Sequence, residues 1–264
     1  MAKTVAPSQA MTTAQAVPRW AVRMRQLQDF LTYDFPVGAK SWKTAWVINF
    51  QKAGTFPFLL TLIWVYGNPT SAAWIYVALH GSYGIAWILK DAVFPDRGWQ
   101  RRVPIIGGIN LFLFVLGWYW MFGWLLISGA SRPTYPLSQP VWFALCISLF
   151  TLGLTVMLSA DAQKHFTLKY SPGLITTGMF RHVRHPNYLG EMMIYGAFAL
   201  LVWHWLPLIV LAWVWIGIFA VNMIHKEASM SRYPEWEAYR ARTGWLLPKF
   251  RKLAASSVSP SSLG

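Results

Sequence analysis

Residues 181–224 read RHVRHPNYLGEMMIYGAFALLVWHWLPLIVLAWVWIGIFAVNMI, a basic segment followed by two apolar runs. The runs cover 188–203 and 206–224, and a membrane-spanning helix needs about 20 predominantly apolar residues. The connection between them, 204–207, is long enough only for a hairpin. We therefore predict two antiparallel helices that cross a bilayer and are entered from the basic segment.

The composition of the whole chain also indicates a membrane protein. Its 264 residues are 55% hydrophobic and 12% charged, whereas soluble domains usually carry about 25% charged residues. The formal net charge of +14 is typical either of nucleic-acid binding or of contact with a membrane surface. Because the basic residues lie between apolar runs, we predict membrane lipid as a partner and no nucleic acid.

Four further apolar runs precede the closing pair and predict the other membrane helices. They cover 45–66, 72–94, 104–127 and 141–160, and the third is long and uninterrupted. The first contains four residues that suit a membrane helix poorly: Gln51, Lys52, Gly54 and Pro57. A re-entrant segment followed by a short helix is therefore an alternative for this run.

The lysines and arginines fix the predicted orientation, because cytoplasmic loops gather these residues. With the N-terminus in the cytosol, every basic connection falls on the cytosolic side. Only Arg132 among the 23 Lys and Arg residues then lies in a loop across the membrane. The predicted fold is all-α: a polytopic membrane helical bundle of about six transmembrane helices, with both termini cytosolic. The endoplasmic reticulum and a bacterial inner membrane fit this topology equally well.

The chain divides into four parts on this reading. Residues 1–18 and 254–264 are predicted to be disordered tails. Residues 19–160 hold an N-terminal amphipathic helix and the first four spans. Residues 161–253 hold a cofactor-binding region and the last two spans. Within 19–35, basic residues and apolar residues at spacings of three and four predict a helix that lies on the membrane surface.

The densest polar cluster of the chain lies between Asp161 and Glu191. Its members are Asp161, Lys164, His165, Lys169, Arg181, His182, Arg184, His185, Asn187, Tyr188 and Glu191. Polar groups at membrane depth are costly and usually functional. The histidines match no ligand spacing known for metal sites, so we predict no metal.

Pro186 suits the first turn of a helix, and it organises this cluster. Asn187 and Glu191 are four residues apart, so they share a helical face. The free backbone N–H groups at such a helix start attract an anion, and Arg184 and Lys164 add positive charge. We predict a site for a phosphorylated nucleotide cofactor. The alternative is that the basic residues contact only lipid phosphates.

The sequence RHPNYLGE at 184–191 resembles the signature shared by steroid 5α-reductases, sterol reductases and isoprenylcysteine carboxyl methyltransferases. The resemblance extends over 161–248. It includes RYPEWEAYRARTGWLLP at 232–248, which is similar to the ending of the steroid 5α-reductase-like (DUF1295) group. In the first half, only hydropathy and a loose H-x-x-Y at His80 and Tyr83 are similar. The resemblance implies a membrane enzyme with a common helical core.

Two chemistries share that core. The reductases carry NADPH and saturate a conjugated carbon–carbon double bond. The methyltransferases carry S-adenosylmethionine and methylate an isoprenylcysteine carboxylate or a phospholipid amine. Asn187 before Tyr188 is typical of the reductases, and the paired glutamates of the methyltransferase ending are absent around Glu227. The histidine-tryptophan-tyrosine run of the reductases is also absent. The resemblance favours an NADPH-dependent reductase, with the methyltransferase as the alternative and an inactive membrane scaffold as a third reading.

The resemblance also implies roles for individual residues. A tyrosine on the second span would polarise the substrate carbonyl, which makes Tyr83 the candidate, supported by His80 and by Gln51 from the first span. The predicted cofactor-binding residues are Asp161, Lys164, Arg184, His185, Asn187, Tyr188, Glu191, Arg232 and Arg240. The substrate would be a lipophilic small molecule, such as a sterol, a polyprenyl or a fatty chain, that enters from the bilayer.

Overall fold

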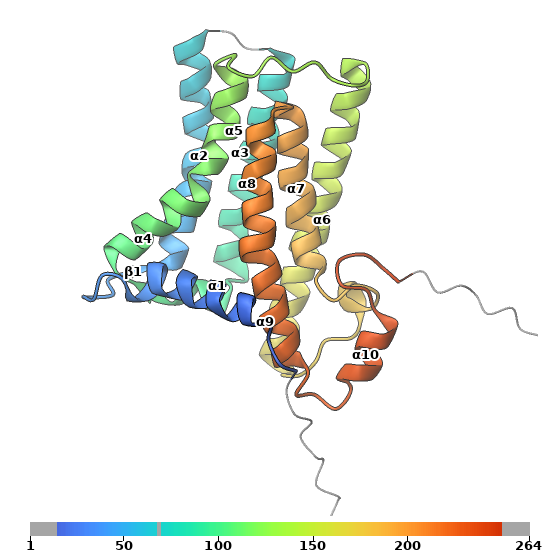
Figure 1. Cartoon of the computed structure of the whole chain (residues 1–264). Coiled ribbons are helices and arrows are strands. Elements are labelled where there is room, and N and C mark those ends of the chain that lie inside the picture. The colour runs from blue at the N-terminus through green and yellow to red at the C-terminus, as the bar shows by residue number, and fades with distance from the viewer. Residues whose placement is uncertain (1–14, 68–69, 250–264) are drawn as a thin grey trace, which may run out of the picture.

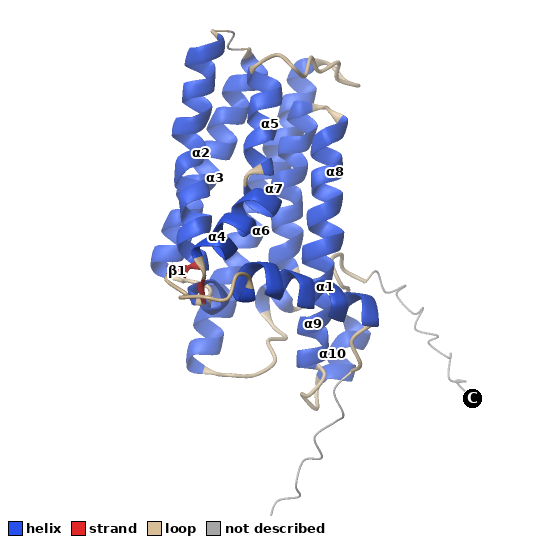
Figure 2. Ribbon diagram, turned by 60° about the vertical axis from the view of Figure 1, so that its left-hand side comes forward, coloured by secondary structure: helices blue, strands red, loops and turns tan. Residues whose placement is uncertain are grey.

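The structure is a computed structural model that describes residues 15–67 and 70–249, and helices make up most of this part. Figure 2 shows the helices standing side by side as one bundle, with a very small strand element at its edge. The prediction of an all-α helical bundle is therefore confirmed. The predicted tails at 1–18 and 254–264 lie outside the described residues, except for 15–18.

The long helices run nearly parallel along the bundle (Figure 1). They are α2 (Thr44–Tyr66), α3 (Ser71–Val93), α5 (Trp118–Ile127), α6 (Gln139–Tyr170), α7 (Pro186–Val202) and α8 (Trp205–Val214), which continues through the π-helical turn η5 (Trp215–Ala220) into α9 (Val221–Met230). The shorter helical elements are α1 (Arg19–Asp29), η1 (Phe30–Asp34), η2 (Arg97–Gln100), α4 (Ile105–Leu111), the π-helical turn η3 (Phe112–Leu116), η4 (Gly178–Phe180) and α10 (Trp236–Arg242). The strands β1 (Trp42–Lys43) and β2 (Arg102–Val103) pair antiparallel.

Positive charge gathers at one end of the bundle, where Figure 1 shows α1, β1 and α10. We call this the basic end. It also carries the connections 94–104 and 171–185, which contain Arg97, Arg101, Arg102, Arg181 and Arg184. Among the described residues in the connections of the opposite end, Arg132 is the only lysine or arginine. The charge therefore separates along the bundle axis as the sequence predicts.

Three helical segments of the described residues are long and apolar enough to cross a membrane. They are Ser71–Val93, Gln139–Tyr170 and Trp205–Met230. A fourth is added if the bent pair Ile105–Leu116 and Trp118–Ile127 counts as one span. The 17 residues of α7 reach only about 25 Å at 1.5 Å per residue, short of a hydrocarbon core of about 30 Å. The structure thus supports an integral membrane protein with three to four clear spans.

Two of the predicted runs differ from their expected shapes. The interrupted run at 45–66 forms the single continuous helix α2, with Pro57 inside it, so the re-entrant alternative is wrong. The run at 104–127 is not one straight helix, because α4 and η3 meet α5 at an angle of 44°. The Gly117 N–H donates to the Phe112 carbonyl at 2.7 Å and closes a π-helical turn, which is a common cause of a sharp bend.

The predicted start of α7 and the predicted hairpin between α7 and α8 are confirmed. Helix α7 begins at Pro186, as predicted. The hairpin after it forms with Trp203 in a left-handed conformation (φ 46°), and the His204 side chain accepts a hydrogen bond from the Leu206 N–H. Helix α6, however, continues to Tyr170, ten residues beyond the predicted end of the apolar run. It therefore carries the first part of the polar cluster beyond the apolar run as a helix.

The predicted amphipathic helix forms as α1 and lies across the basic end. Its side chains Trp20 and Leu27 are each 48% exposed, and Phe30 at the start of η1 is 49% exposed. On its inner face, Arg25 Nη2 donates to Asn222 Oδ1 at 2.6 Å and Gln28 Nε2 donates to a carbonyl of η5 at 2.5 Å. The outer face is thus available to lipid, while the inner face is fastened to η5 and α9.

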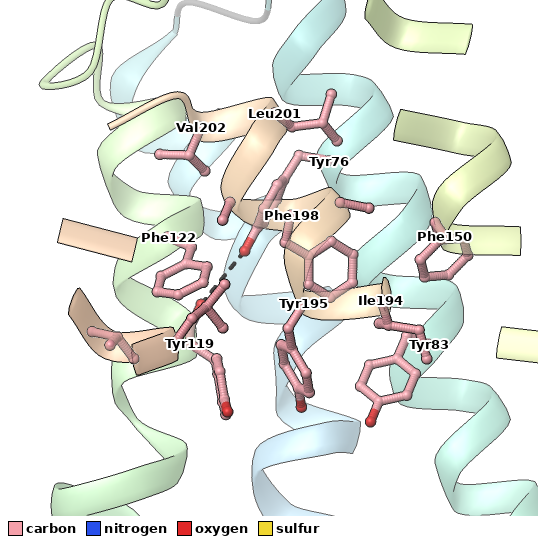
Figure 3. Close-up of a cluster of buried hydrophobic side chains, with 14 of the residues drawn as sticks. Tyr76, Tyr83, Tyr119, Phe122, Phe150, Ile194, Tyr195, Phe198, Leu201 and Val202 are labelled. Atoms are coloured by element: carbon pink, nitrogen blue, oxygen red, sulfur yellow. Dashed lines mark hydrogen bonds between the residues drawn. The ribbon is translucent and has the colours of Figure 1, made fainter. Parts of the chain in front are cut away.

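An aromatic core fills the bundle where α3, α5 and α7 meet (Figure 3). Tyr119 and Tyr195 stack with ring centroids 4.1 Å apart, and Phe198 is fully buried beside them. Figure 3 shows the hydroxyls of Tyr83, Tyr119 and Tyr195 pointing the same way, away from the end of α7 that holds Leu201 and Val202. The core is therefore apolar toward the opposite end and lined by phenols toward the basic end.

Helices α6 and α7 approach each other backbone to backbone at Gly153 and Gly190. A Cβ on Gly190 would lie 2.6 Å from the Gly153 carbonyl oxygen and 2.6 Å from the Met157 nitrogen. A Cβ on Gly153 would lie 2.7 Å from the Met193 Cβ. Membrane helices commonly use small residues for such close packing, because van der Waals contact is the main force between them.

We expect Gly190→Ala to destabilise the bundle by about 1–3 kcal/mol, because the added methyl overlaps the backbone of α6. Gly196→Ala on the same helix is the matched control, since a Cβ there meets nothing within 4 Å. Alanine favours the helix over glycine by up to about 1 kcal/mol, so the control is expected to be neutral or stabilising. Thermal unfolding in detergent measures both variants. Equal melting temperatures for the two would contradict the close packing.

Candidate functional site

A cavity of about 240 Å³ lies toward the basic end of the bundle. Helices α1, α2, α3, α5, α6, α7 and α9 all contribute to its wall. Its charged and hydrogen-bonding lining comprises Arg25, Gln28, Asp29, Thr32, Tyr33, Thr44, Lys52, Tyr83, Lys90, Asp96, Tyr119, Asp161, Asn187, Tyr188, Glu191, Tyr195, Asn222 and Lys226. Ligand sites are usually concave and combine an apolar wall with a few converging polar groups, so this cavity is the candidate site.

The cavity brings together five of the predicted site residues. Tyr83 from α3 and Asp161 from α6 face Asn187, Tyr188 and Glu191 from the first turns of α7. Asn187 and Glu191 both line the cavity, so the prediction that they share a face of one helix is confirmed. Part of the polar cluster predicted between Asp161 and Glu191 therefore lines the same cavity as Tyr83 of the second predicted span.

Arg184 and His185 lie outside this cavity and hold the C-terminal segment. Arg184 Nε donates to Glu227 Oε1 at 2.6 Å, and His185 Nε2 lies 3.3 Å from the same oxygen. Arg184 Nη1 also donates to the Thr243 carbonyl at 2.7 Å. The backbone N–H groups of both residues donate to carbonyls of Gly244 and Trp245. These side chains therefore fasten the chain after α10 to the start of α7.

The other predicted cofactor residues also lie outside the main cavity. Arg232 donates to Ser229 and Tyr233, its neighbours in the chain, at 2.7 Å and 3.1 Å. Arg240 is partly buried, and its Nη1 lies 3.9 Å from Glu237 Oε2. Lys164 lines an adjoining cavity of about 110 Å³ that shares Lys90, Asp96 and Asp161 with the main one.

Of the predicted catalytic residues, only Tyr83 reaches the cavity. Gln51 is buried and its amide donates to Thr55 Oγ1 at 3.3 Å. His80 Nδ1 lies 2.9 Å from the Tyr76 hydroxyl, and its ring stacks on Phe198 at 4.4 Å. The Tyr83 hydroxyl is buried beside the Tyr195 hydroxyl and makes no hydrogen bond of ordinary geometry among the described residues. Because the Tyr83 side chain lines the cavity, its hydroxyl is a candidate donor to a ligand.

The sequence prediction missed the lysines of the site. Lys52 lies in the middle of α2, and its Nζ donates to the Tyr195 hydroxyl at 2.5 Å. Lys90 pairs with Asp161 at 2.9 Å, and Lys226 donates to the Tyr188 hydroxyl at 3.0 Å. A lysine inside an apolar run is itself a signal of function, but beside Gln51, Gly54 and Pro57 it also reads as one more interruption of the run. Tyr195 carried no signal, because an aromatic residue in an apolar run is ordinary.

The family comparison matches the second half of the chain. The family described as "Protein of unknown function (DUF1295)" matches residues 99–245, which is more than half of the chain. The chain belongs to the DUF1295 family. No curated protein matched it. The predicted resemblance to the DUF1295 group is thereby confirmed, and the family description carries no activity with it.

One wall of the cavity lies within the residues that the DUF1295 family matches. The matched range 99–245 holds the elements from α4 to α10 and includes the lining residues Asp161, Asn187, Tyr188, Glu191 and Lys226. The opposite wall, on α1 to α3, lies before the matched range. The site is therefore assembled from the part of the chain that the family model covers and from the part that precedes it.

Asp96 lines both cavities and lies in the connection between α3 and α4 at the basic end. Burial alone would raise the pKa of its carboxyl, but Lys164 at 3.4 Å, the Gly98 N–H at 2.8 Å and the lysines at 226 and 90 outweigh burial. The pKa of Asp96 is therefore held below its ordinary value, and the carboxylate is ionised at neutral pH. In the described residues no group of three or more His, Cys, Asp or Glu side chains is arranged to hold a metal.

Proposed function

We propose that this protein is a membrane-embedded NADPH-dependent reductase that saturates a carbon–carbon double bond conjugated to a carbonyl in a lipophilic substrate. The observation that carries the proposal is the buried Tyr83 hydroxyl. It makes no hydrogen bond of ordinary geometry among the described residues, and the Tyr83 side chain lines the cavity together with Asn187 and Glu191. A preorganised donor in a site of low polarity can stabilise the negative charge that develops on a carbonyl oxygen.

We also propose the six-span topology with both termini in the cytosol. The separation of the basic residues along the bundle supports it, because cytoplasmic segments gather lysine and arginine. Helices α2 and α7 would be the two further spans. Both turn polar residues toward the cavity rather than toward lipid, as Lys52 and Glu191 do. Polar residues in membrane helices usually face the bundle interior in this way.

The residues of the cavity fit the reactive end of NADPH. A volume of about 240 Å³ is below the roughly 300–1,000 Å³ of pockets that enclose a drug-sized ligand, so the site would hold only part of a dinucleotide. Arg25, Lys226 and the first N–H groups of α7 would bind its phosphates at the basic end. When bound, NADPH supplies a hydride for an electron-poor carbon of the substrate.

The side chains of the chain would then position the substrate and its charge. Tyr83 donates a hydrogen bond to the carbonyl oxygen. An apolar wall receives the lipophilic body of the substrate and excludes water; it is formed by Leu111, Val115, Leu116, Val214, Ile218 and Phe219. Most of this wall comes from η3 and η5, the π-helical turns of two apolar segments. The substrate would therefore enter the cavity from the bilayer.

The charge of the site favours the reductase over the S-adenosylmethionine-dependent methyltransferase. The sulfonium of S-adenosylmethionine is positive, and aromatic rings are the usual partners of such a cation. Here the ammonium of Lys52 already lies over the rings of Tyr83 and Trp87, at 4.4 Å and 5.3 Å. An ammonium disfavours a sulfonium beside it and favours an oxygen that becomes negative.

Thermal unfolding of the purified protein with added cofactor tests the proposal. NADPH is expected to raise the melting temperature, since ligand at 100 times its Kd adds about 2.7 kcal/mol of stability. S-adenosylmethionine at the same concentration is expected to leave it unchanged. The NADPH effect should be lost in Asn187→Ala and Glu191→Gln and kept in Arg132→Ala, at the opposite end of the bundle. A response to S-adenosylmethionine alone would replace the reductase by the methyltransferase, and a response to neither would reject both.

A further inference from the structure

Lys52 is an ammonium group enclosed by aromatic rings in the centre of the bundle. Only 3% of its surface is exposed. Its Nζ lies within about 6 Å of four ring centroids, which is the range of favourable cation–π contact. The rings are those of Tyr83, Trp87, Tyr119 and Tyr195. A charge at this depth is costly to maintain and usually has a function.

Among the described residues, Lys52 forms no ion pair like that of its neighbour Lys90. Lys90 pairs with the Asp161 carboxylate at 2.9 Å. None of the ion pairs formed by residues 15–67 and 70–249 involves Lys52. Its protein partners are aromatic faces and one hydroxyl, although Glu191 lines the same cavity. The ammonium therefore remains available to an anionic group that enters the cavity.

Tyr195 connects this ammonium to the cavity. Its hydroxyl oxygen accepts the hydrogen bond from Lys52, so its own hydrogen points to the neighbouring Tyr83 hydroxyl or to a ligand. Tyr195 and Tyr83 lie edge to face, with ring centroids 5.6 Å apart. Figure 3 shows their hydroxyls pointing in the same direction from α7 and α3. Two phenols and one ammonium thus converge on one part of the cavity.

We infer that Lys52 and Tyr195 are the catalytic acid pair of this site: Tyr195 protonates the carbonyl oxygen of the substrate, and Lys52 returns a proton to Tyr195. The inference rests on the proposed reductase function. The pair would act beside Tyr83, which donates a hydrogen bond to the same oxygen. An ammonium in apolar surroundings stabilises both the negative oxygen of the substrate and the phenolate of Tyr195.

Bound NADPH would supply a hydride, with its two electrons, to the carbon β to the carbonyl. The electrons of the carbon–carbon double bond move into a new double bond between the α-carbon and the carbonyl carbon. The carbonyl oxygen takes the proton of Tyr195, which gives an enol. Lys52 reprotonates the Tyr195 oxygen and recovers its own proton from water, and the enol tautomerises to the saturated ketone.

A binding experiment without cofactor tests the pair directly. The probes are 4-octylbenzoate, whose carboxylate resembles the negative oxygen, and 4-octylacetophenone, its neutral ketone counterpart. Wild-type protein in detergent is expected to bind the carboxylate more tightly. Lys52→Met should lose about 10- to 100-fold of carboxylate affinity and keep its affinity for the ketone, because one charge-assisted contact is removed. Lys52→Arg keeps the charge and should retain most of the carboxylate preference.

Matched variants separate this effect from loss of fold. Lys169→Met removes an exposed lysine of α6, and Tyr170→Phe removes an exposed hydroxyl. Both should bind the carboxylate as the wild type does. Tyr195→Phe should weaken carboxylate binding even if Lys52→Met fails to fold, since it removes only the hydroxyl. Equal affinity for the two probes in the wild type, or an unchanged carboxylate affinity in Lys52→Met and Tyr195→Phe, would overturn the inference.

The same preparations distinguish this inference from the proposed function. Each protein is also melted with and without NADPH. A stabilisation by NADPH without a carboxylate preference would keep the reductase and reject the acid pair. A carboxylate preference that depends on Lys52, without any effect of NADPH, would keep the anion-stabilising pair and reject the reductase.

Discussion

The Tyr83→Phe variant is expected to reduce lipophilic enones about 10²- to 10³-fold more slowly than the wild type, with no change in its stabilisation by NADPH. Loss of one donor to a developing negative oxygen typically has this effect on turnover. The substitution keeps the ring, which lies under the Lys52 ammonium at 4.4 Å. The Tyr83 hydroxyl makes no hydrogen bond of ordinary geometry among the described residues, so its removal should cost little stability.

The loss of NADPH absorbance in the presence of a panel of lipophilic enones measures this effect. Tyr66→Phe is the matched control, because Tyr66 ends α2 at the opposite end of the bundle and is 42% exposed. It should turn over as the wild type does. A rate for Tyr83→Phe within a few-fold of the wild type would show that Tyr83 donates nothing to the reacting oxygen.

The Glu227→Ala variant is expected to lose about 3–5 kcal/mol of stability, because it leaves a buried arginine without its carboxylate. The side chains of Arg184 and Glu227 are only 8% and 14% exposed, and the two groups lie 2.6 Å apart. Arg184 also holds the Thr243 carbonyl after α10. The loss should therefore appear first as release of the C-terminal segment, which limited proteolysis at Arg240 and Arg242 detects.

Two further variants make this test specific. Glu237→Ala removes a carboxylate that is 73% exposed and 3.9 Å from Arg240, and no change in stability is expected. Replacing both Arg184 and Glu227 by methionine and leucine should recover part of the loss, because a buried charge pair can be exchanged for apolar side chains. If Glu227→Ala kept its stability but lost its response to NADPH, Arg184 would belong to the cofactor site after all.

The two halves of the segment RHPNYLGE, before and after Pro186, contact different parts of the structure. Arg184 and His185 precede α7 and turn to Glu227 and the C-terminal segment. Asn187 and Glu191 follow Pro186 and turn into the cavity. The proline explains the division, since it begins the helix and so changes the direction of the chain at that point. Residues that are adjacent in a motif can therefore serve stability on one side and a site on the other.

Local properties of the sequence were sufficient for the bundle and for half of the site. Hydropathy located the helices, and the basic residues identified one end of the bundle, because both depend on residues that are near one another in the chain. The start of α7 at Pro186 and the shared face of Asn187 and Glu191 follow from helix geometry alone. The bend of 44° before α5 could not be predicted, since the π-helical turn η3 lies within an unbroken apolar run.

Only the tertiary structure decided which side chains lie opposite the face of α7 that holds Asn187 and Glu191. Lys52 and Tyr195 are 143 residues apart, and nothing in either apolar run indicates that they meet. The physical reason is that lipid is as apolar as the interior of the bundle, so hydropathy does not say which face of a membrane helix turns inward. Close packing of the helices makes that choice, and with it places the ammonium of α2 against the phenols of α3 and α7.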